Sequence, residues 1–235
     1  AMVYINDLEG KISKINLTSH GTLFEQQVLM NLNANFDTKR YSYFEMEAGI
    51  GGTTGHFWLF GGTGDFSRIS DTGNDQGDLM DNILYGVRDY DYPLFKPKDG
   101  YRVLPDSNWL ENAARNAGNA DHIDDVAHKC QDTTGDNFPD DCNTGGKKAW
   151  IVKLGIADGK PSGSTANTFR KVSAAPTLYR GNVYFPVYEP DKENNCNLGK
   201  AFICARNDEC GSNNSHAIDE DGNTAKGNCF ELDQR

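Results

Sequence analysis

Short runs of alternating polar and apolar residues, separated by Gly, Asn and Asp, recur along the chain. Near the start, residues 3–5 and 11–17 form two such runs around a turn that contains Gly10, which predicts a β-hairpin. Further strands are predicted at residues 56–60, 82–89, 148–154, 175–179, 181–187 and 201–204. The glycine-rich run 61–64 is interpreted as a turn. Short strands at this spacing indicate an all-β fold, either a sandwich or a propeller.

A reused hairpin pattern favours the propeller. A glycine precedes a strand at Gly10, before Lys11 and Ile12, and again at Gly181, before Val183 and Tyr184. Such repetition is expected when one hairpin serves blade after blade. The strands suffice for about three to four blades, which is few for a closed propeller. Residues 1–235 are therefore expected to form a β-propeller domain or a fragment of a larger one.

One region departs from the β pattern. Residues 105–109 have the features of a helix start, with Asp106 or Ser107 available as a cap. Apolar residues then follow at helical spacing up to residue 129. The sequence predicts two short helices within an insertion that covers residues 99–147, approximately.

The same insertion contains an Asp-rich loop bracketed by Cys130 and Cys142. Calcium takes six to eight oxygen ligands, which a short loop supplies at alternate positions beside a sharp glycine turn. The loop has this spacing and predicts one structural calcium ion, with the Phe138 carbonyl among the ligands. The candidate ligands are Asp132, Thr134, Asp136, Phe138, Asp140 and Asp141. The alternative is an Asp-rich turn that is closed by its own hydrogen bonds.

The chain has six cysteines, all in the C-terminal half, and they indicate in which cellular compartment the protein folds. None forms a Cys-x-x-Cys pair and the five histidines are scattered, which argues against zinc. An even number of cysteines in turn-rich sequence indicates disulfides and an oxidising compartment. The short loop between Cys130 and Cys142 predicts that these two pair, whereas Cys196, Cys204, Cys210 and Cys229 leave three pairings open.

Charge and motifs exclude several classes of function. The formal net charge of -11 and the absence of a basic run argue against a nucleic-acid partner. No apolar run is long enough to span a membrane. The chain lacks a nucleophile elbow, a zinc-protease motif and a phosphate-binding loop, so it is expected not to be an enzyme. A glycosidase function, which needs a pair of carboxylates, stays open because the chain has many Asp and Glu residues.

Several segments together resemble the motifs of one known protein family. Residues 3–17 resemble the family's "VYxGDLxGxxWxxDL" blade, with Lys14 near the position of the usual Trp. Residues 60–66 are similar to its Gly-Thr-Gly strand end, and residues 84–89 resemble its "YGixD" element. The most specific likeness covers residues 171–190 and 196–201, which resemble "RxxsxPxxxxGxVyFxxxxP…CxxG". With these motifs the chain resembles the PilC/PilY family of type IV pilus tip and biogenesis proteins.

The resemblance implies a β-propeller from the C-terminal region of a large secreted protein. Such a module is extracellular or displayed on the cell surface at the pilus tip, and it supports pilus assembly and adhesion. Its expected partners are minor pilins or the pilus tip and a host or abiotic surface. Two other interpretations stay open. One is a quinone-dependent dehydrogenase propeller, although only Trp58, Trp109 and Trp150 could supply its docking repeat. The other is a calcium-stabilised structural spacer.

Overall fold

The regular elements of this protein are β-strands wherever its structure is described. The structure is a computed structural model, and it describes residues 1–8, 10–19, 21–32, 41–66, 82–89, 91–95, 149–154, 170–191, 199–209, 211 and 229–232. The prediction of an all-β chain is confirmed for these residues. The predicted helical insertion at 99–147 lies outside them.

The strands form three antiparallel sheets that follow one another along the chain. The first sheet holds β1 (Met2–Asn6), β2 (Lys11–Asn16) and β3 (Gln26–Asn31) in sequence order. The second sheet has the order β4 (Glu47–Ile50), β5 (Phe57–Gly62), β6 (Ile83–Arg88) and β7 (Ala149–Lys153). The third sheet has the order β12 (Cys229–Glu231), β11 (Lys200–Asn207), β10 (Asn182–Glu189) and β8 (Lys171–Val172), and β9 (Thr177–Tyr179) also pairs with β10.

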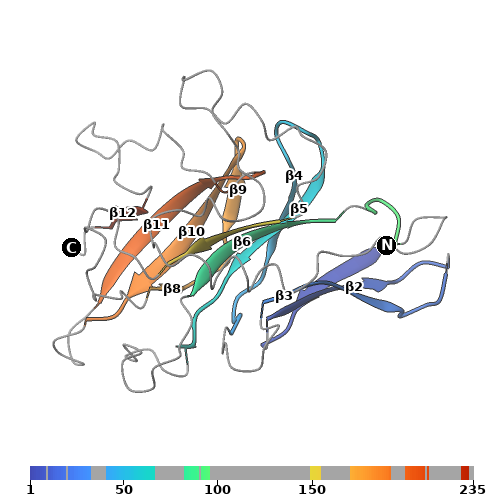
Figure 1. Ribbon diagram of the computed structural model, residues 1–235, viewed down its shortest axis with the longest axis horizontal. Helices are drawn as coiled ribbons and strands as arrows, with labels where there is room; N and C mark the ends of the chain where they lie inside the picture. Colours follow the sequence, from blue (N-terminus) through green and yellow to red (C-terminus); the bar gives the residue numbers. More distant parts are fainter. Residues whose placement is uncertain are drawn as a thin grey trace, which may run out of the picture.

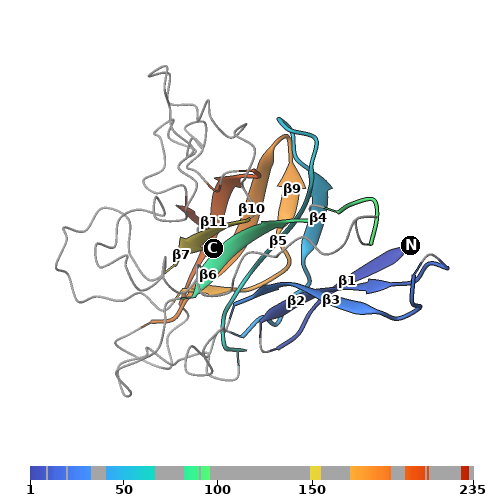
Figure 2. The same cartoon turned by 45° about the vertical axis from the view of Figure 1, so that its right-hand side comes forward.

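The second sheet lies between the other two, and apolar side chains cover both of its faces. Residues in a strand point alternately to opposite faces. In β5, Leu59 packs into a core shared with the first sheet, whereas Trp58 and Phe60 pack into a core shared with the third sheet. Figures 1 and 2 show the sheets side by side in this order, from blue through green and yellow to red.

Two hairpins confirm the predicted glycine-led turns. Gly10 has a φ of 80° and leads from β1 into β2, and Gly181 has a φ of 75° and leads from β9 into β10. Arg180 before it has a φ of 48°, and Tyr179 and Asn182 are directly paired. Two consecutive residues with positive φ form the type I′ turn that matches the twist of a tight hairpin.

The predicted turn at residues 61–64 is wrong in its first half, because Gly61 and Gly62 continue strand β5. These glycines serve close packing instead. A β-carbon at Gly61 would overlap the side chain of buried Tyr85, and one at Gly62 would overlap Cγ2 of Val172 on the third sheet. The pair therefore lets neighbouring side chains approach the backbone of a central strand.

Candidate functional site

A buried lysine lies at the interface of the first and second sheets. Lys14 in β2 is directly opposite Tyr4 in β1, so both side chains point to the same face of the first sheet. That face also carries Ile12, which packs into the core shared with the second sheet. The register of the first hairpin therefore delivers an amine and a phenol to a buried interface.

Two carboxylates meet this lysine from the second sheet. Asp89 follows the last residue of β6, and its backbone N–H donates to the Phe57 carbonyl at 3.1 Å, which extends the pairing with β5. The Asp91 backbone N–H donates to Asp89 Oδ1 at 3.0 Å, so the turn after β6 is closed by the side chain of Asp89. This local turn places both carboxylates on the side of the first sheet.

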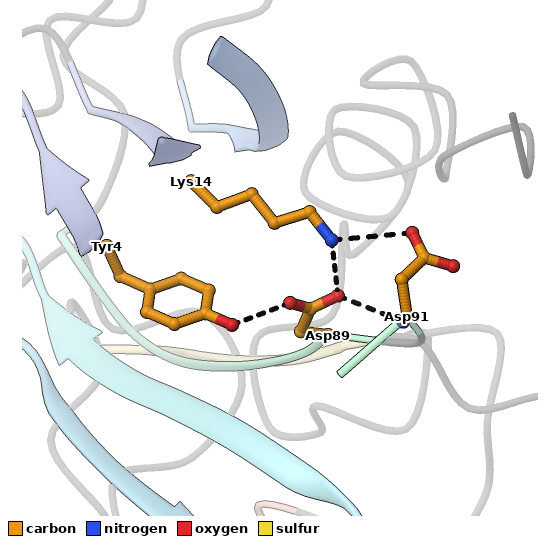
Figure 3. Close-up of polar contacts among 4 residues, drawn as sticks. All are labelled: Tyr4, Lys14, Asp89 and Asp91. Carbon is orange, nitrogen blue, oxygen red and sulfur yellow. Dashed lines mark hydrogen bonds and ion pairs between the residues drawn. The ribbon is translucent and has the colours of Figure 1, made fainter. Parts of the chain in front are cut away.

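Figure 3 shows the resulting cluster, called here the lysine cluster: Tyr4, Lys14, Asp89 and Asp91. Lys14 Nζ lies 2.9 Å from Asp89 Oδ1 and 3.4 Å from Asp91 Oδ2. The Tyr4 hydroxyl donates to Asp89 Oδ2 at 2.7 Å. Each oxygen of Asp89 therefore has its own donor, and the carboxylate is held in one orientation.

Aromatic rings surround the cluster. Lys14 Nζ lies 5.5 Å from the centre of the Phe95 ring, within the range of a cation–π contact. Tyr4 packs against Phe57 at 5.2 Å between ring centres, and Phe57 stacks on Tyr92 at 4.3 Å. The lysine cluster is thus a small group of polar side chains within an apolar interface.

Because the lysine cluster is buried, the interactions between its charged groups are strong. The exposed fraction of the side chain is 0% for Lys14, 1% for Asp89 and 5% for Asp91. Burial, and after it the hydrogen bond to Asp89, raises the pKa of Tyr4, so the phenol keeps its proton and remains a donor. An amine held against a carboxyl group, with a second carboxylate beside it and little water, can exchange protons and can undergo condensation.

A second buried polar group joins the second and third sheets. Asp208 and Glu209 follow β11 and accept hydrogen bonds from the tip of the β4–β5 hairpin. The Gly52 N–H donates to Asp208 Oδ2 at 2.9 Å, and the Thr54 N–H donates to Glu209 Oε1 at 2.8 Å. One oxygen of each carboxylate, Asp208 Oδ2 and Glu209 Oε1, thus holds the hairpin tip, which is a structural role.

Burial changes the titration of this clamp. It raises the pKa of Asp208, an effect that the neighbouring charge of Glu209 strengthens and that the hydrogen bond from Gly52 opposes. Burial also lowers the pKa of nearby His56, and the positive charge of Arg88 acts in the same direction. Both groups therefore favour their uncharged forms more than they would in water.

A disulfide joins the last two strands of the third sheet. Cys204 in β11 is directly opposite Cys229 in β12, and the two are bonded. The prediction of disulfides is confirmed for this pair, and of the three pairings left open only the one containing Cys204–Cys229 remains. The other cysteines lie outside the described residues.

The predicted calcium site also lies outside the described residues, together with its bracketing Cys130 and Cys142. This holds for every candidate ligand: Asp132, Thr134, Asp136, Phe138, Asp140 and Asp141. Within the described ranges, no group of three or more His, Cys, Asp or Glu side chains is placed to hold a metal ion. Nor does any helix in those ranges have the length and apolar character needed to cross a membrane.

Sequence reasoning missed the lysine cluster, although one signal was present. Ile12, Lys14 and Asn16 share one face of β2, and Ile15 lies on the other. The two isoleucines are three residues apart, so they lie on opposite faces of the strand. A strand with one buried face would carry its apolar residues on that face alone. A lysine on the face that carries Ile12 would then be expected to need a buried carboxylate partner.

Comparisons of the chain with models of known protein families, with curated proteins and with solved structures found no match.

Proposed function

We propose that this chain is a non-enzymatic, cell-surface module of a type IV pilus tip-associated protein, built as a β-propeller or as part of one. The observation that carries the proposal is the stack of three antiparallel sheets in chain order, with the middle sheet covered on both faces. Neighbouring blades of a propeller are related in this way. The resemblance of residues 3–17 and 171–190 to the PilC/PilY family supplies the pilus context.

The outer face of the first sheet supports a larger propeller. Val3, Ile15 and Val28 share that face, because Val3 pairs with Ile15 and the neighbouring Ser13 pairs with Val28. Val3, Ile5 and Val28 are between 37% and 41% exposed, which is unusual for a strand face of this composition. An additional blade packed here would bury these side chains in the same way as the second sheet is buried.

The disulfide supports the extracytoplasmic location. Disulfides form and persist in oxidising compartments and are rare in the cytosol. The Cys204–Cys229 bond joins two adjacent strands of the third sheet, and Cys204 is buried, so it has the character of a structural rather than a catalytic disulfide.

The positions of the tryptophans favour this proposal over a quinone-dependent dehydrogenase. Trp58 and Trp150 are 2% exposed and fill the core between the second and third sheets. The Trp150 indole N–H donates to the Asp208 carbonyl at 2.8 Å. Two of the chain's three tryptophans thus serve packing, so they are not available as a docking platform for a quinone.

Direct binding tests the proposal. Purified chain with calcium is expected to retain the minor pilins of the encoding organism on a column, and to do so less well after chelation of calcium. Serum albumin coupled at the same density serves as the control. Equal retention of pilins by both columns would instead leave the chain as a structural spacer.

A further inference from the structure

We propose that Lys14 and Asp89 condense into an intramolecular isopeptide bond, an amide between Nζ of Lys14 and Cγ of Asp89, with Asp91 as the proton carrier. The bond would join the first sheet to the second covalently, across 75 residues of sequence. This inference rests on the lysine cluster alone and is independent of the pilus proposal.

The reacting groups are already in contact. Lys14 Nζ lies 2.9 Å from Asp89 Oδ1, an ordinary hydrogen-bond distance that needs no further movement of the two sheets. A pair held at this distance reacts as one molecule, and such fixed orientation is worth an effective concentration of about 10⁵ M or more. Figure 3 shows the amine directed at the Asp89 carboxyl group from the opposite sheet.

Burial shifts the equilibrium between the ion pair and the amide toward the amide. In water the ammonium and the carboxylate are strongly hydrated, and the separated ions are preferred to the amide. Here the side chains of Lys14 and Asp89 are 0% and 1% exposed, so neither charge retains that hydration. The amide is neutral and fits a desolvated interface better than the ion pair that it replaces.

The step balances without any added reactant. The Lys14 ammonium gives one proton to Asp91 Oδ2, which lies 3.4 Å away, and becomes a nucleophilic amine. Asp91 passes this proton to Asp89 Oδ1, so the amine attacks Cγ of a neutral carboxyl group and the C–N bond forms. A second proton from the nitrogen then reaches Oδ1, the C–Oδ1 bond breaks and water leaves. The Asp91 carboxylate is restored.

Tyr4 and the Asp91 backbone support this reaction at the two oxygens of Asp89. The Tyr4 hydroxyl donates to Oδ2 at 2.7 Å, so it polarises the carbonyl and stabilises the negative charge that develops there. The Asp91 N–H donates to Oδ1 at 3.0 Å, on the oxygen that departs. The two oxygens thus have different donors, as a carbonyl oxygen and a leaving oxygen require.

The chain contains an internal control in Lys200 and Glu231. Their Nζ and Oε1 atoms are 3.0 Å apart, close to the separation in the lysine cluster. The side chains are 59% and 51% exposed, however, so both charges remain hydrated. Contact alone should leave this pair as separate ions.

Intact mass spectrometry of the folded, then denatured and fully reduced chain tests the proposal. The main species is expected to be lighter by one water than the sequence requires. Tandem spectra of a digest should contain a branched peptide that joins Lys14 to Asp89, and none that joins Lys200 to Glu231. A folded sample with the full sequence mass would overturn the proposal.

Two variants distinguish the cross-link from other losses of water, such as cyclisation of an aspartate. Lys14→Arg keeps the positive charge but cannot condense, so it should recover the full mass. Asp91→Asn keeps the shape but cannot carry the proton, and it should recover the full mass in most molecules. Loss of water in Lys14→Arg would contradict the cross-link, and unchanged loss in Asp91→Asn would contradict the role of Asp91.

Discussion

At the scale of single residues, several unusual side chains and glycines of this protein are explained by what lies on the next sheet. Gly62 is one such residue, because it belongs to β5 but faces Val172 on the third sheet. Lys14 is another, because the carboxylates that match its charge follow β6 on the second sheet. Neither can be understood from its own strand.

Gly62→Ala is expected to destabilise the chain by about 1–3 kcal/mol, the usual cost of overpacking. The added methyl group would overlap Cγ2 of Val172 and lie 3.2 Å from the Ile83 carbonyl, and neither neighbour can move without disturbing the stack. Urea unfolding measures the loss.

The matched control is Gly52→Ala. A β-carbon there would meet its nearest neighbours at 3.6 and 3.7 Å, which is ordinary contact. The control should change the free energy of unfolding by less than about 0.5 kcal/mol. Equal losses in the two variants would show that Gly62 is not required for close packing.

Asp208→Asn is expected to change how stability depends on pH. Burial raises the pKa of Asp208 in the folded chain above its ordinary value of 3.8. The folded state therefore holds this proton more tightly than the unfolded state, and the resulting stabilisation is complete below that value and is lost as the pH rises through the raised pKa.

Asparagine cannot titrate but can still accept the hydrogen bond from Gly52. The stability of the variant relative to the wild type should therefore increase between about pH 4 and pH 7. Urea unfolding at several pH values measures this difference. A difference that is constant over the range would mean that Asp208 titrates as it does in water.

At the scale of elements, the hairpin edges of the sheets carry the strongest local restraints. β11 and β12 are joined by the Cys204–Cys229 disulfide and by the exposed pair Lys200–Glu231. The first restraint is covalent and its Cys204 end is buried, whereas the second is hydrated, so the two should differ widely in their effect on stability.

Replacing both Cys204 and Cys229 by Ala is expected to cost about 3.5 kcal/mol, the loop-closure entropy of a cross-link over this separation of 25 residues. The double variant Lys200→Ala, Glu231→Ala on the same strands should cost less than about 1 kcal/mol. Chemical unfolding of both variants checks this order. Equal costs would contradict the structural role assigned to the disulfide.

The sequence predicted most elements, and the exceptions have physical reasons. β1, β2, β5, β6, β7, β9, β10 and β11 all overlap predicted strands, because their apolar residues mark a buried face. β3, β4, β8 and β12 were not predicted. "QQVLMN" lacks alternation, "EAGI" has a single large apolar residue, and β8 and β12 are only 2 and 3 residues long. The end of β5 was taken for a turn because two glycines look the same at a turn and at a close contact.

Local pattern indicates a buried Lys14 but could not identify the residues that contact it. Lys14 and Asp89 are 75 residues apart, and only the stacking of the first sheet on the second brings them together. The Cys204–Cys229 pairing depended in the same way on the register of β11 and β12. The predicted calcium ligands at 132–141 remain a prediction from spacing.

At the scale of the whole molecule, the proposed calcium ion is expected to stabilise the chain. A ligand that binds only the folded state stabilises it by RT ln(1 + [L]/Kd), which is about 2.7 kcal/mol at a hundredfold excess over Kd. Millimolar calcium should raise the melting temperature of the wild type and have little effect on Asp136→Ala. The same shift in both would place calcium elsewhere.

We propose that the stacked sheets serve a pilus tip-associated protein, and the display of pili tests this directly. The most direct measurement is a count of surface pili, by electron microscopy, on cells of the encoding organism from whose gene the segment for residues 1–235 has been deleted. The account predicts a large loss of pili and of adhesion, and recovery of both when the intact gene is supplied in trans. Wild-type numbers of pili and wild-type adhesion in the deletion strain, with the shortened protein present at the normal level, would contradict the claim.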